Sequence, residues 1–149
     1  PNTSTVIFSG NALATTDPYF TDENNFDFSL AESSEHVDAG VFLTTATGSG
    51  NSETISVSDP SFFYDGFGIS GEQGDVIQLE GSTTTARIIS IDYTSKTLTL
   101  DKALSWNDGQ GIALKYNGNS PDVGAFERSS GTSTLAPPSP PHSLKVIEE

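Results

Sequence analysis

The stretch 86–100, ARIISIDYTSKTLTL, contains two runs of alternating apolar and polar residues separated by the turn Tyr93–Lys96. Alternation with a period of two is typical of β-strands that bury one face. Similar runs occur at residues 54–57, 76–79 and 112–116. We therefore predict a small antiparallel meander that curls into a barrel. One face of its sheet is expected to carry Ile77, Leu79, Ile89, Ile91, Leu98, Leu100, Ile112 and Leu114.

The composition favours an all-β protein and excludes several other classes. The chain has 149 residues, of which 14 are Gly and 8 are Pro. It holds 20 acidic and 6 basic residues, a formal charge of −14, so neither nucleic acid nor an anionic membrane surface is an expected partner. The absence of Cys excludes disulfides and thiolate metal sites. The sequence has no apolar run long enough for a transmembrane helix, and no membrane insertion is expected.

Two short motifs flank the predicted meander. Residues 27–30 and 34–40, DFSL and SEHVDAG, resemble the D-F-x-L and S-P-A-I-D-A-G signature near the end of secreted bacterial right-handed parallel β-helix proteins. Glu35 and His36 replace the usual Pro and Ala. Residues 121–127, PDVGAFE, resemble the P-D-I-G-A-Y/F-E segment that closes the same solenoids. The resemblance implies the C-terminal end of a pectate-lyase-like β-helix, and a chain that is part of a longer extracellular or cell-surface protein.

The resemblance also implies a division into parts. We expect terminal β-helix rungs over 1–45, an inserted small antiparallel β domain over 46–118, a closing β-helix strand over 119–127, and a Pro/Ser-rich linker with the start of a further β module over 128–149. The closing strand is expected to pack onto Val37 and the run Val6–Phe8, through Val123, Ala125 and Phe126. Residues 128–141 are expected to be mobile because they bring little apolar surface to bury.

Each of the two motifs contains an aspartate next to small residues. Asp38 and Asp122 stand beside Ala and Gly residues that allow close backbone approach. Short acidic side chains of this kind accept hydrogen bonds from turn amides. We therefore expect both residues to be structural rather than catalytic or metal-binding.

Aromatic residues are the candidate sugar contacts. Aromatic ring faces suit the C–H faces of pyranoses, and Trp106 stands at a turn beside polar neighbours. We predict a carbohydrate-binding surface made of Trp106, Asn107, Asp108, Tyr64 and Tyr116, with the Phe62–Phe67 cluster as a further platform. The alternative is that most of these rings fill the core or the cap of the small barrel.

Calcium is the one cofactor that the sequence suggests. Asp22, Asn24 and Asp27 place hard oxygen ligands of the type that Ca²⁺ prefers on one loop. The EF-hand spacing is absent, and an acidic solvated turn is the alternative. His36 and His142 stand in a turn and in the Pro-rich segment, and there is no G-x-S-x-G motif, so no catalytic residue is predicted.

The resemblance implies a function for the segment as a whole. We expect a non-catalytic C-terminal cap or accessory region of an extracellular β-helix protein that acts on or binds polysaccharide, with the upstream β-helix rungs of the same chain as its partner. One alternative is a structural or adhesive surface module without a sugar site. The other is a part of a polysaccharide lyase or glycoside hydrolase whose active site lies upstream.

Overall fold

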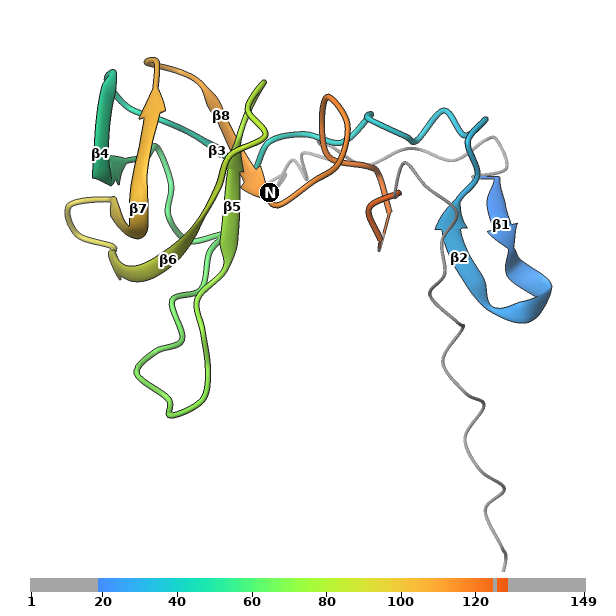
Figure 1. Cartoon of the computed structure of the whole chain (residues 1–149), viewed down its shortest axis with the longest axis horizontal. Coiled ribbons are helices and arrows are strands. Elements are labelled where there is room, and N and C mark those ends of the chain that lie inside the picture. Colours follow the sequence, from blue (N-terminus) through green and yellow to red (C-terminus); the bar gives the residue numbers. More distant parts are fainter. Residues whose placement is uncertain (1–18, 125, 129–149) are drawn as a thin grey trace, which may run out of the picture.

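The computed structural model describes residues 19–124 and 126–128, which form an all-β structure (Figure 1). The helical structure of this part of the chain is one 3-10 turn, η1 (Glu23–Asn25). The strands are β1 (Phe20–Asp22), β2 (Asp27–Leu30), β3 (Thr44–Thr45), β4 (Gly50–Ser56), β5 (Val76–Leu79), β6 (Thr85–Asp92), β7 (Thr97–Trp106) and β8 (Gly111–Leu114).

The sheet of β3 to β8 curls and closes on itself. Its strand order is β3-β8-β5-β6-β7-β4, and every neighbouring pair is antiparallel. The two outer strands meet beyond their ends, where Ala46 and Val57 form an antiparallel bridge. The amide of Thr47 donates to the carbonyl oxygen of Ser56 at 2.8 Å, and the amide of Ser58 donates to that of Thr45 at 2.9 Å. The predicted curled antiparallel barrel is therefore present. The predicted meander is found only in β5, β6 and β7, because β8 pairs with β5 instead of β7 and β4 pairs with β7.

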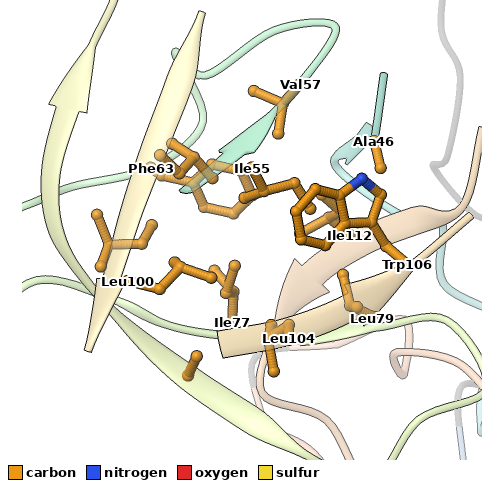
Figure 2. Close-up of a cluster of buried hydrophobic side chains, with 13 residues drawn as sticks. Ala46, Ile55, Val57, Phe63, Ile77, Leu79, Leu100, Leu104, Trp106 and Ile112 are labelled. Carbon is orange, nitrogen blue, oxygen red and sulfur yellow. The ribbon is translucent and has the colours of Figure 1, made fainter. Parts of the chain in front are cut away.

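Apolar side chains fill the barrel (Figure 2). Alternation along β7 and β8 buries Leu98, Leu100 and Ile112 almost completely. The buried cluster as a whole consists of Ala46, Ile55, Val57, Phe63, Ile77, Leu79, Ala86, Ile88, Leu98, Leu100, Leu104, Trp106 and Ile112. This continuous interior holds the strands together and fixes the loops that leave them.

The predicted inward face is wrong at Ile89 and Leu114, which are 55% and 45% exposed. In β6, Ile88 pairs with Leu100 while Ser90 pairs with Thr99, so one extra residue bulges out of the ladder. The bulge turns Ile89 outward and returns Ile91 to the core. Ile88 thus takes the inward position that the sequence analysis gave to Ile89.

The strands β1 and β2 form a separate antiparallel hairpin on the other side of the molecule (Figure 1). Phe20 and Phe28 meet edge to face across it, with ring centroids 5.4 Å apart. A two-stranded hairpin alone is marginally stable in water, so this part would gain from a neighbouring surface. The described strands pair only in antiparallel fashion and do not show a parallel β-helix, which stays a prediction.

Residues 36–40, which follow the hairpin, are hydrogen-bonded to residues 117–123, which follow the barrel. We call these two segments together the clasp. The amide of Gly40 donates to the carbonyl oxygen of Pro121 at 2.7 Å, and the amide of Val123 donates to that of His36 at 2.9 Å. The expected return of the closing segment to the region of Val37 is therefore found at residues 121–123.

Carboxylates lock the clasp. Asp122 Oδ1 accepts the Asp38 amide at 2.8 Å, and Asp38 Oδ1 accepts the Asn119 amide at 2.9 Å. Glu127 accepts the amides of Asp122 and Asn117, at 3.0 Å and 3.1 Å. These bonds give both aspartates the structural role expected for them.

The packing expected of the closing segment is wrong at its end. Phe126 is 61% exposed, so its ring is not buried in a core. Ala125, the run Val6–Phe8 and residues 129–149, with the predicted linker, lie outside the described residues.

Candidate functional site

The structure places two of the predicted sugar contacts inside the barrel. Trp106 is only 9% exposed and lies among core side chains (Figure 2), and its Nε1 has no hydrogen-bond partner among the described residues. Tyr116 is 4% exposed, and its hydroxyl donates to the carbonyl oxygen of Leu79 at 3.0 Å. Neither ring offers a face to a sugar, so the alternative of core packing describes both.

Trp106 is the last residue of β7, so it belongs to the sheet rather than to the turn that follows. Trp106 pairs with Gly50 across the β4–β7 ladder, and a Cβ atom at Gly50 would lie 2.6 Å from Trp106 Cζ2. The absence of a side chain at Gly50 makes room for the indole.

Asn107 and Asp108 are exposed, but their contacts belong to the turn. The Asn107 amide donates to Gln110 Oε1 at 3.0 Å. Asp108 Oδ1 accepts the Gly48 amide at 2.7 Å, and the Asp108 amide donates to Ser49 Oγ at 3.0 Å. These bonds tie the β7–β8 turn to the β3–β4 turn, and with Trp106 buried no aromatic platform stands beside them.

Of the predicted aromatic contacts, the exposed ones lie on the long connection between β4 and β5, which extends beyond the barrel wall (Figure 1). Other exposed rings, among them Phe26 and Tyr93, stand elsewhere. We call residues 62–75 the aromatic loop. Phe62, Phe67 and Ile69 are more than half exposed on it, with Phe67 at 65%. Tyr64, partly buried, meets Phe67 edge to face with ring centroids 5.1 Å apart and an interplanar angle of 85°. Of the predicted sugar contacts, Tyr64 is therefore partly accessible, and the Phe62–Phe67 cluster exposes Phe62 and Phe67 while Phe63 is buried in the core.

The base of the aromatic loop is held firmly against β6. Asp65 Oδ1 accepts the Phe67 amide at 2.9 Å, and its Oδ2 accepts the Ile91 amide at 3.0 Å beside the bulge. Asp75 and Tyr64 exchange two hydrogen bonds, each of 2.9 Å. The Arg87 guanidinium donates to the Gly74 carbonyl oxygen at 2.6 Å. These contacts, which hold the base of the loop in one place, were not predicted from the sequence.

Phe67 adopts a left-handed backbone conformation with φ of 45°. A bulky residue rarely takes this conformation, which costs about 1–2 kcal/mol per residue. An exposed Phe contributes little burial to offset that cost. Strain of this kind gathers at ligand-binding sites. Phe26 of the hairpin shares it, with φ of 61° and 73% exposure, so the aromatic loop is the candidate site because its exposed rings also stand on a base bonded to β6.

Negative charge surrounds Tyr64. Burial raises the pKa of its phenol, and the carboxylates of Glu72, Asp65 and Asp75 raise it further, as does a hydrogen bond with Glu72. The phenol therefore stays protonated and serves as a hydrogen-bond donor rather than as a nucleophile. The loop offers apolar ring surface and acceptor oxygens, which suits binding better than catalysis.

The predicted calcium ligands make contacts of their own. Asp22 and Asp27 stand opposite each other in the backbone register of the hairpin. Asp22 Oδ2 accepts a hydrogen bond from Asn25 Nδ2 at 2.6 Å. Asp27 Oδ1 accepts the Ser29 hydroxyl and amide, and these bonds lower the pKa of the Asp27 carboxyl. Within residues 19–124 and 126–128, no group of three or more His, Asp or Glu is arranged to hold a metal ion. The site with Asn24 stays a prediction.

An open groove lies between β8 and the clasp. Leu43, Leu114 and Val123 line it, together with Asp122 and Glu127. Both carboxylates already accept backbone amides there, so they hold the chain together rather than form an acid–base pair. His36 takes part in the clasp through its backbone, and His142 lies outside the described residues.

Comparisons with known proteins add no relative. No family model, curated protein or solved structure matches the chain. In the described part of the chain, no helix is long and apolar enough to cross a membrane. Functional inference therefore starts from the aromatic loop and the clasp.

Proposed function

We propose that the chain is a non-catalytic cap and accessory region of an extracellular protein with a right-handed parallel β-helix, and that it binds polysaccharide through the aromatic loop. The observation that carries the binding role is the exposed ring of Phe67, which stands on a left-handed backbone and meets Tyr64 on a loop bonded to β6. Rigid rings bind a sugar chain at low entropic cost.

The clasp supports the cap role. The two motifs that resemble the end of a β-helix stand about 80 residues apart in sequence, and hydrogen bonds join them in space. The barrel between them is thus an appendage attached at one place. Because the segments before and after the barrel are bonded to each other, the barrel can be present without displacing the strands on either side of it, which suits an accessory domain.

Binding to immobilised polysaccharide tests the proposal. The 149-residue chain is run through affinity gels that contain neutral glycans, and separately polyuronates, with and without calcium. We expect a neutral glycan to retard the chain, or a polyuronate only when Ca²⁺ bridges it to the acidic protein surface. Phe67→Ala should abolish the retardation. Phe126→Ala is the matched control, because its ring is about as exposed but stands outside the loop.

Three results would contradict the proposal. Retardation that Phe67→Ala leaves unchanged would exclude the aromatic loop as the site. No retardation by any glycan would favour the alternative, a structural or adhesive surface module without a sugar site. Cleavage of any polysaccharide by the purified chain would show that it is an enzyme. If the chain binds without cleavage, an upstream lyase or hydrolase domain remains a compatible partner.

A further inference from the structure

The charges around the exposed rings are strongly one-sided. Glu72, Asp65 and Asp75 all act on the Tyr64 phenol. Glu72 is exposed, so its charge is open to a ligand. The guanidinium of Arg87 donates to the Gly74 carbonyl oxygen at the base of the loop. A ligand at the rings therefore meets acidic groups first.

An aromatic face beside carboxylates favours a cation with an apolar body. An ammonium group is attracted to the face of an aromatic ring and to a nearby carboxylate, while its carbon skeleton covers the ring. A neutral sugar gains the ring contact and hydroxyl hydrogen bonds to the carboxylates but no attraction between opposite charges, and a uronate is repelled by the acidic groups. Among polysaccharides, one chemistry meets both features: a chain of amino sugars whose amines are free and protonated.

We infer that the aromatic loop binds a cationic amino-sugar polysaccharide in preference to neutral and acidic ones. This inference rests on the proposed function, because it names the ligand class for the same loop. Phe67 and Tyr64 provide the ring surface, and Glu72, an exposed carboxylate hydrogen-bonded to the Tyr64 phenol, pairs with a sugar amine. Asp65 and Asp75 keep their amide bonds and contribute their charge.

A pair of ligands that differ only in acetylation tests the inference. Isothermal titration compares an unacetylated glucosamine oligomer with its fully N-acetylated counterpart of equal length, at mildly acidic pH and low salt. We expect the unacetylated oligomer to bind more tightly and to lose affinity as salt is added. Phe67→Ala should weaken both oligomers by about threefold to tenfold.

Substitutions at two acidic positions distinguish the effect of the Glu72 charge from the effect of the overall charge of the protein. Glu72→Gln should weaken the unacetylated oligomer by about twofold to fivefold and leave the acetylated one unchanged. Glu53→Gln, an equally charge-reducing change at an exposed position of β4, should alter neither. An equal loss from both variants would mean that overall charge attracts the ligand, and would overturn the assignment of Glu72.

The remaining outcomes distinguish this inference from the proposed function. Equal affinity for the two oligomers would overturn the preference for amines and leave sugar binding by the loop in place. Failure of both oligomers and of every neutral glycan would overturn the proposed function itself. An oligolysine peptide that binds as tightly as the unacetylated oligomer, with the same dependence on Phe67, would show that the loop binds basic peptides and would overturn the sugar assignment.

Discussion

Replacing Asp122 with Ala should open the clasp and leave the barrel folded. Asp122 is 9% exposed, and its two oxygens accept the amides of Asp38 at 2.8 Å and Arg128 at 2.6 Å. A hydrogen bond to a charged group contributes about 1.5–3 kcal/mol, so two would contribute about 3–6 kcal/mol. Because Arg128 is partly exposed and its amide regains water on opening, we expect a loss of about 2–4 kcal/mol from clasp stability.

Two readouts follow the two parts separately. Hydrogen exchange of the Gly40 amide, which donates to Pro121 in the clasp, should accelerate roughly 30- to 1,000-fold, because each 1.4 kcal/mol is a factor of ten. The single Trp is buried in the barrel, so its fluorescence reports barrel unfolding in urea. The urea midpoint should not change. Glu53→Ala, at an exposed carboxylate of β4, should alter neither readout.

Either of two results would refute this reasoning. An unchanged exchange rate at Gly40 would mean that the Asp122 carboxylate does not hold the clasp. A urea midpoint that falls by the full free energy lost from the clasp would mean that the clasp and the barrel unfold as one unit, so that the barrel is not an independent appendage.

Three further changes test the barrel, the loop and the acid response. Gly50→Ala should lower unfolding stability by about 1–3 kcal/mol in urea titrations, because its new methyl group collides with the Trp106 ring; an unchanged midpoint would contradict that close approach. Phe67→Gly should abolish glycan retardation while thermal stability stays equal or rises by up to about 1–2 kcal/mol, because Gly accepts the positive φ without strain; lost stability would indicate a structural role. Hydrogen bonds, foremost those from Ser95, lower the pKa of Asp92 below its ordinary value of 3.8. The ionised Asp92 therefore stabilises the folded chain above pH 3.8, and this stability is lost as the pH falls through the lower pKa of the folded state. In acid titrations, Asp92→Asn should lose less unfolding free energy below pH 3.8 than the parent chain.

The sequence predicted the barrel because its signal is repeated. Alternation in several short runs points to the same curled sheet, and the error at Ile89 arose from two adjacent isoleucines that alternation alone does not distinguish. The bulge that turns Ile88 inward is supported by the Asp65 carboxylate, which meets Ile91 from 26 residues away. Such a contact leaves no periodic mark in the sequence.

The candidate site was predicted only in part, for a similar reason. Trp106 stands next to Asn107-Asp108-Gly109, which is typical of a turn, and only its pairing with the side-chain-free Gly50 explains why the ring is buried. The aromatic residues 62–67 were recognised from their type, but their exposure depends on how Asp65, Asp75 and Arg87 hold the loop to β6. The aspartates of the clasp were identified correctly because short acidic residues beside Gly have a restricted set of roles.

The position of the clasp determines how the barrel would experience mechanical load. Tension applied to the chain before residue 32 and after residue 128 first meets the Arg128–Glu32 ion pair and the Arg128 amide bond to Asp122, and then the Val123–His36 hydrogen bond. This order follows because the two segments run antiparallel and both outer ends lie at the same side of the clasp. The bonds would then separate one after another, like a zipper, while the barrel strands carry no force. On an anchored cell-surface protein, stretching would therefore open the clasp and lengthen the tether before it reached the sheet that presents the aromatic loop.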